Sequence, residues 1–123
     1  MKPIIKILFI LTTLMLAFQT NAAGDYDGVW KDEINLGIFG SFHQQGSTMI
    51  FIPLDPSTLE WEAYAGAITG TTASVSTIIS EATANLEIEF TSFTEGVITI
   101  GTCSPAIECD FNPGDQIPIK KVF

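Results

Sequence analysis

The sequence predicts an all-β protein, either a small antiparallel up-and-down barrel or a sandwich, with about seven or eight short strands. Three observations carry this prediction. Apolar and polar residues alternate with a period of two in several segments, and turn residues separate these segments at regular intervals. After the N-terminal stretch, no segment shows a convincing helical period.

The first 22 residues are predicted to be a cleaved secretory signal peptide. Two lysines form a basic start, an apolar run follows from residue 7 to about residue 17, and small residues lead to a cleavage site after Ala22 or Ala23. The apolar run is shorter than the roughly 20 residues that span a bilayer. We therefore expect one β domain over residues 23–123, exported to the periplasm or the extracellular space.

The domain that remains after cleavage is strongly acidic. It keeps three lysines, Lys31, Lys120 and Lys121, against all 14 acidic residues of the chain, which gives a net charge of −11, and it contains no arginine. A field of this sign repels nucleic acid and anionic membrane surfaces. We expect no nucleic-acid partner, whereas cationic partners stay open.

The two cysteines, Cys103 and Cys109, lie close together in the segment CSPAIEC. In an oxidising compartment a disulfide is the expected state of such a pair. A redox motif more typically has two intervening residues, and a zinc site needs more ligands than two cysteines and one histidine comfortably provide. The sequence therefore predicts a structural disulfide, with no metal site and no cofactor.

The predicted strands follow one another along the chain as hairpins. The clearest strand is at 84–93, where Leu86, Ile88 and Phe90 point to one face and polar residues point to the other. Its antiparallel partner is predicted at 97–103. Further strands are expected at 27–32, 37–44, 47–54, 59–70, 71–80 and 117–123.

The ends of this strand series carry two further expectations. The strand at 27–32 is placed to close against the last one, and Pro118 indicates that the last strand is an edge or begins irregularly. Eight membrane strands of about 9–11 residues each, with their turns, would exceed the length of the mature domain. We therefore expect no membrane insertion.

The hairpin between the second and third predicted strands contains a Gln-Gly turn. With residues 45–46 as the two central turn residues, Phe42 is expected to face Met49, and Gly40 to face Phe51. The aromatic ring would then cover the glycine. The turn glycine suits a position that needs a positive φ.

The only histidine, His43, lies in this hairpin, where we expect a polar residue able to contact a partner. A general base needs a reacting group and an orienting partner, and neither Ser41 nor Ser47 has the Gly-x-Ser-x-Gly context of a hydrolase nucleophile. Glu87 and Glu89 share one strand face, and paired carboxylates hydrolyse glycosides. A domain of about 100 residues leaves little room for such a cleft, so we expect no enzyme and predict no catalytic residue.

Aromatic residues are the other candidates for ligand contact. Trp30, Trp61 and Tyr64, together with the phenylalanines, either fill the core or form a wall for a small apolar ligand or a sugar. In the strand at 59–70, Trp61 is expected to share a face with Ala63, and Tyr64 to point to the other face. A small barrel holds at most one small ligand.

Part of the pattern resembles small exported bacterial β-barrel-like domains. These have a Gly-x-Trp start, a Gln-Gly hairpin, and then a strand with a tryptophan and a Gly-x-x-x-Gly end. The matching positions are Gly28, Trp30, Gln45, Gly46, Trp61, Gly66 and Gly70. The second tryptophan and SGWG-like segment of that family are replaced here by INLGIFG, and the resemblance implies a fold rather than an activity. In size, export and disulfide the chain is also similar to periplasmic lysozyme inhibitors with small barrels.

These observations lead us to expect an exported, non-catalytic binding domain. It would recognise either a protein, such as a basic hydrolase, or a small apolar ligand. The alternative is a structural or surface-assembly subunit that uses an open strand edge, and a small hydrolase is the third reading. Ligand binding predicts a cavity lined by Trp61 and phenylalanines, and the candidate contact residues are His43, Trp30, Trp61 and Tyr64.

Overall fold

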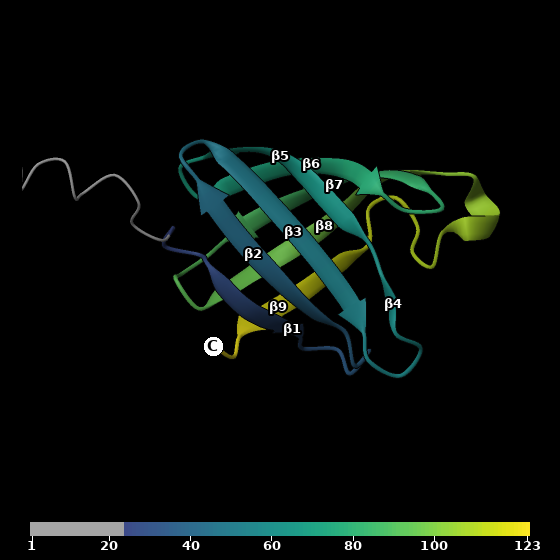
Figure 1. The fold of residues 1–123 in the computed structure, drawn as a ribbon, viewed down its shortest axis with the longest axis horizontal. Helices are drawn as coiled ribbons and strands as arrows, with labels where there is room; N and C mark the ends of the chain where they lie inside the picture. The colour runs from purple at the N-terminus through teal and green to yellow at the C-terminus, as the bar shows by residue number, and fades with distance from the viewer. Residues whose placement is uncertain (1–23) are drawn as a thin grey trace, which may run out of the picture.

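The computed structural model describes residues 24–123, so the predicted signal peptide at 1–22 lies outside the described residues. Nine strands and one short 3-10 turn make up this part of the chain (Figure 1). They are β1 (Gly28–Asp32), β2 (Phe39–Gln45), β3 (Thr48–Asp55), β4 (Glu60–Trp61), β5 (Ala63–Thr69), β6 (Thr72–Ile79), β7 (Thr83–Phe90), β8 (Glu95–Ser104), η1 (Ala106–Glu108) and β9 (Gln116–Lys121). The all-β prediction is confirmed. Between residues 24 and 123 there is no helix with the length and apolarity needed to span a membrane.

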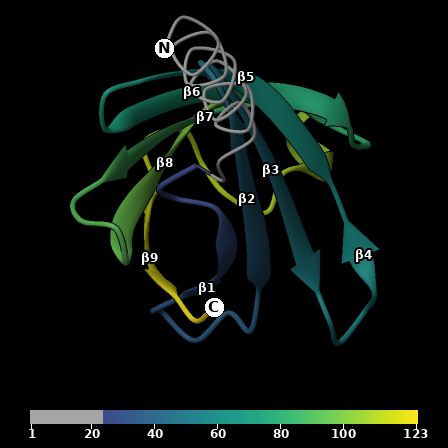
Figure 2. The same cartoon turned by 60° about the vertical axis from the view of Figure 1, so that its left-hand side comes forward.

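Eight of the strands form a closed antiparallel barrel, which Figure 2 shows as a ring of strands. Apart from β4, each strand pairs with the next one along the chain, and β1 pairs with β9 to close the ring, as expected. The two-residue strand β4 pairs only with β3. The structure is therefore the up-and-down barrel rather than the sandwich, and closure removes the edges that an open sheet would expose.

The interior of the barrel follows the predicted alternation. Leu86, Ile88 and Phe90 of β7 are all buried, and the first two lie opposite Ile100 and Ile98 of β8. Since β-branched and other apolar side chains alternate with polar ones along both strands, one face of the sheet packs inward and the other meets water. Burial of these side chains, at about 25 cal/mol per Å² of apolar surface, supplies much of the stability of the domain.

The β2–β3 hairpin turns one residue later than predicted. Its two central residues are Gly46 and Ser47, and Gly46 has a φ of 59°, which a residue without a Cβ adopts at no steric cost. Phe42 therefore pairs with Phe51 rather than with Met49, so the predicted pairing is wrong by two residues. Because side chains alternate with a period of two, this error leaves each residue on its predicted face.

A β-bulge interrupts the β5–β6 ladder between Ala63, which pairs with Ile79, and Tyr64, which pairs with Thr77, so the extra residue is Ile78 of β6. Both of these adjacent residues are buried, with Tyr64 only 6% exposed, whereas Trp61 is 52% exposed. Tyr64 belongs to the buried core cluster, whereas Ala63 does not, in keeping with the prediction that the two residues point to opposite faces. The bulge adds its residue to β6 and therefore leaves the alternation along β5 in place.

Pro118 does not mark an edge strand, because β9 pairs with both β8 and β1. Its carbonyl accepts a hydrogen bond of 2.9 Å from the N–H of Glu33, which follows the last residue of β1. The pairing with β1 begins at Ile119. Proline has no N–H to donate, and this position tolerates it because the regular ladder to β1 has ended there.

The two ends of the barrel differ in how they are filled. The β2–β3, β5–β6 and β7–β8 turns lie at one end, on the left in Figure 1, which we call the closed end. Tyr26 stacks on Phe90 there with ring centroids 3.9 Å apart, and Trp30 meets Phe90 and Phe42 edge-on at 5.4 and 5.6 Å. The β1–β2, β3–β5, β6–β7 and β8–β9 connections gather at the other end, which we call the open end.

Candidate ligand site at the open end of the barrel

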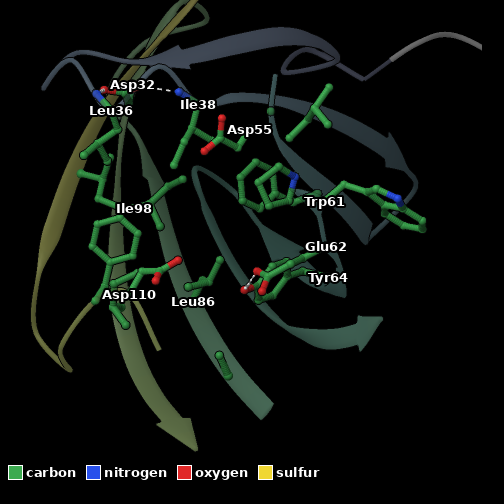
Figure 3. Close-up of a pocket in the computed structure, with 18 of the residues that line it drawn as sticks. Asp32, Leu36, Ile38, Asp55, Trp61, Glu62, Tyr64, Leu86, Ile98 and Asp110 are labelled. Carbon is green, nitrogen blue, oxygen red and sulfur yellow. Dashed lines mark hydrogen bonds between the residues drawn. The ribbon is translucent and has the colours of Figure 1, made fainter. Parts of the chain in front are cut away.

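A cavity of about 210 Å³ lies inside the open half of the barrel (Figure 3). Its wall is mostly apolar and comes from several strands. Among the lining residues are Phe42, Phe51, Leu86, Ile98, Ile100 and Ile117. The cavity borders directly on the aromatic cluster of the closed end, since Trp30 and Phe42 belong to that cluster and also line the cavity.

Small residues keep this space open. Gly40, Ala82 and Ala84 line the cavity, and each of the two alanines leaves room that a larger inward side chain would fill. The ring of Phe51 lies across Gly40, since a Cβ on that glycine would stand 2.4 Å from Phe51 Cε2. The predicted contact between these two residues is thus present, although Gly40 pairs directly with Pro53.

A carboxylate held by two hydroxyl groups lies where the cavity opens. Tyr64 Oη donates to Glu62 Oε2 at 2.6 Å (Figure 3). Ser80 Oγ donates to Glu62 Oε1 at 2.8 Å. Burial raises the pKa of the Tyr64 hydroxyl, and the hydrogen bond to Glu62 and the negative charge of Glu62 raise this pKa further. Tyr64 therefore stays protonated and keeps donating to Glu62.

A second, polar hollow of about 460 Å³ adjoins the mouth of the cavity, and we call it the vestibule. Five carboxylates line it: Glu60, Glu62, Glu81, Glu108 and Asp110. Four of these, all except Glu81, also line the cavity. The pKa of the Glu108 carboxyl is raised because it shares a hydrogen bond with Glu81 and lies in the field of that carboxylate.

Within residues 24–123 the only ion pair joins His43 to Asp27, with 3.2 Å between Nδ1 and Oδ2. This pair lies on the outer surface near the closed end, so it does not neutralise the vestibule. Lys31 is the one basic residue that lines the cavity, and it is exposed and lies opposite Lys120 in the β1–β9 ladder. The open end therefore carries a net negative charge.

The structure brings three of the four predicted contact residues together around the cavity. Trp30 forms part of its floor and is only 1% exposed, Tyr64 forms part of its wall, and Trp61 lies at the exposed rim. His43 is not among the lining residues. It pairs with Ile50 rather than with Thr48, the partner that a turn at residues 45–46 would give it, and its role as a partner contact stays a prediction.

Sequence reasoning missed Glu62 as a site residue. The signal that could have found it is the spacing of Glu62 and Tyr64, since residues two apart in a strand have side chains that meet. The other acidic pair that drew attention, Glu87 and Glu89, lies on the outer surface. Their carboxylates accept hydrogen bonds from Ser74 and Thr72 on β6, and the Thr72 and Thr71 hydroxyls lower the pKa of Glu89.

The disulfide between Cys103 and Cys109 is present, as predicted. Both cysteines line the cavity, and the loop that they close carries η1 with Glu108. Phe111, which follows the loop, packs against the core. The bridge thus ties part of the vestibule to β8. Across residues 24–123, no three His, Cys, Asp or Glu side chains are grouped so that they could hold a metal ion.

Comparison of the chain with protein-family models, with curated proteins and with solved structures gave no match.

Proposed function

We propose that the domain binds one small apolar molecule in the barrel cavity, without catalysing a reaction. The observation that carries this proposal is the cavity of about 210 Å³, which opens at one end and is lined by aromatic and aliphatic side chains. An apolar protein cavity of about 150 Å³ binds benzene. The cavity of this domain therefore has room for one ring, or for a short alkyl chain, together with a small substituent.

The expected affinity follows from the size of such a ligand. A molecule of about ten non-hydrogen atoms that gains roughly 0.7 kcal/mol per atom binds with a Kd on the order of 10 μM. The aromatic floor is already packed, so the protein does not need to order these side chains when the ligand enters.

The proposal is tested by filling the cavity. Ala84→Leu places three additional carbon atoms in the lining, and Ala67→Leu makes the same change on the exposed face of β5. Binding of 2-phenylethanol and hexan-1-ol is followed by tryptophan fluorescence and calorimetry. We expect Ala84→Leu to weaken binding at least tenfold and Ala67→Leu to leave it unchanged. Equal binding by all three proteins, or no binding of either alcohol to the wild type, would refute the proposal.

A second candidate function, recognition of a basic protein, is favoured by the exposed apolar residues at the open end. Leu59 and Ile107 are 74% and 89% exposed, and both lie beside the carboxylates of the vestibule. Exposed apolar side chains with a charged rim are typical of protein-binding surfaces. Binding to a basic hydrolase such as lysozyme should then weaken with added salt and with Ile107→Ser. A flat salt response would count against this candidate.

The reading as an assembly subunit has less structural support. Among the described strands only β4 has a free edge, and it is two residues long. Sedimentation over a wide concentration range tests this reading, which requires oligomers that form as the concentration rises.

A further inference from the structure

We propose that the natural ligand of the cavity is a small amine, whose apolar part fills the barrel and whose ammonium group binds the carboxylate of Glu62. This inference rests on the proposed function and names the chemical class of the ligand. It predicts a primary ammonium group attached by a short linker to one ring or to an alkyl chain of similar volume.

The first argument is the position of Glu62. This residue lines both the apolar cavity and the polar vestibule and is itself partly buried. A ligand with its apolar part in the cavity therefore has its polar end beside this carboxylate. Of the residues that face both hollows, Glu62 is the one whose two oxygens are each held by a hydroxyl donor.

The second argument is the number of acceptor positions left on Glu62. An ionised carboxylate offers about four lone-pair positions, and the Tyr64 and Ser80 hydroxyls use one on each oxygen. Further N–H donors therefore find acceptor positions on a carboxylate whose orientation is already fixed. A fixed first contact of this kind lowers the cost of ordering the site when the ligand binds.

The third argument is the charge around the mouth. Glu60, Glu81, Glu108 and Asp110 surround Glu62 in the vestibule, and the ion pair of the described domain lies near the closed end. The pKa of the Glu108 carboxyl is raised, first by a hydrogen bond with Glu81 and then by the negative charge of Glu81. A bound cation relieves the repulsion between these carboxylates, and the field of the vestibule raises the local concentration of cations.

Other ligand classes fit the site less well. A carboxylate or phosphate ligand would meet this negative field, and the chain has no arginine to bind it. A metal ion finds no group of three ligating side chains in residues 24–123, and it would leave the apolar cavity unfilled. A neutral apolar molecule fits the cavity but makes no use of Glu62, so it serves as the reference in the test.

The experiment compares three probes that share a phenyl ring and a two-carbon linker: 2-phenylethylamine, 2-phenylethanol and 3-phenylpropanoate. Their affinities are measured by calorimetry for the wild type, Glu62→Gln and Glu87→Gln. The last variant removes one negative charge on the outer face of β7 and is the matched control. Thermal melts establish that each variant is folded.

The proposal predicts that the wild type binds the amine at least tenfold more tightly than the alcohol and binds the propanoate least. Glu62→Gln should reduce the amine to the affinity of the alcohol, whereas Glu87→Gln should keep the preference. If Glu62→Gln fails to fold, Glu62→Asp is used instead. Its side chain is one methylene shorter, so the carboxylate lies farther from the ligand, and the preference for the amine over the alcohol should fall several-fold.

Three results would overturn the proposal, and only the last of them would also refute the proposed function. Equal affinity of the wild type for the amine and the alcohol refutes the ammonium contact but leaves the apolar site standing. An undiminished amine preference in Glu62→Gln refutes the assignment to Glu62. Failure of all three probes to bind removes the proposed function together with the inference.

Discussion

The hydroxyl of Tyr64 donates to the carboxylate of Glu62 at the boundary between an apolar cavity and an acidic vestibule. Tyr64 is buried in the core cluster, and Glu62, two residues before it, lines both the cavity and the vestibule. One hydrogen bond thus joins a residue of the apolar cavity to a carboxylate of the vestibule. The pH at which Tyr64 ionises therefore depends on whether this bond is formed.

The raised pKa of Tyr64 predicts a specific loss of stability at high pH. In the unfolded chain tyrosine ionises near pH 10, whereas the folded state keeps Tyr64 neutral to a higher pH because of burial and the carboxylate of Glu62. The folded state then holds the proton that the unfolded state releases, so this contribution is complete below about pH 10 and is lost progressively above it. Urea unfolding of the wild type and Tyr64→Phe across this range should show a steeper decline for the wild type. Parallel declines would contradict the prediction.

Gly40→Ala should destabilise the domain and narrow the cavity. The new Cβ would stand 2.4 Å from Phe51 Cε2, so the ring has to move. We expect a loss of about 1–3 kcal/mol in the free energy of unfolding, as for other overpacked cores, and weaker binding of 2-phenylethanol. Phe51→Leu, combined with Gly40→Ala, should recover part of the stability because it removes the clashing ring. A Gly40→Ala protein with wild-type stability would show that the ring does not lie across this glycine.

Loss of the disulfide should have a moderate effect on folding and a separate effect on the site. The bridge joins cysteines six positions apart, and closing a loop of this size stabilises a protein by about 2 kcal/mol in the chain-entropy treatment. Replacement of Cys103 and Cys109 by serine should lower the free energy of unfolding by that amount. It should also weaken binding of 2-phenylethylamine, because Glu108 and Asp110 are no longer tied to β8. Complete unfolding, or unchanged binding of the amine, would contradict this account.

His43→Ala should leave the cavity intact. The imidazole lies on the outer surface, and its ion pair with Asp27 is exposed on the histidine side, so the expected change in stability is within about 0.5 kcal/mol. Asp27→Ala should cost more, because Asp27 Oδ1 also accepts a 2.6 Å hydrogen bond from the backbone N–H of Gln44. A tenfold loss of affinity for 2-phenylethanol in His43→Ala would place this residue in the site and contradict the structure. The same variant tests the separate prediction that His43 contacts a protein partner.

The strand pattern of the barrel was predictable because it depends on local alternation. Leu86, Ile88 and Phe90 face inward as their spacing indicates, and the predicted pairing of the first strand with the last is present. The predicted disulfide is also present, between two cysteines that lie only six positions apart in the chain. The inward-facing residues and the disulfide depend on residues close together in the sequence. The pairing of the first strand with the last follows because it closes the sheet and leaves no free edge.

The site was less predictable because it depends on departures from that pattern. The bulge in the β5–β6 ladder adds its extra residue, Ile78, to β6, and no residue type in that segment marks it. Gly40 and Ala84 line the cavity in the open half of the barrel, while aromatic rings fill the closed end. Which end of the barrel contains the cavity depends on residues that are far apart in the sequence. The period-two alternation within single strands does not predict it.

The central claim is that a small molecule enters the open end of this barrel, and methyl NMR spectra recorded during a titration with 2-phenylethylamine test it most directly. The account predicts progressive shifts for the methyl groups of Leu86, Ile98 and Ile117, which line the cavity. Val75 and Ile88 are buried but do not line it, so their signals should stay in place. Shifts confined to Val75, Ile88 or the outer surface, or no shifts at all at saturating amine, would contradict the account.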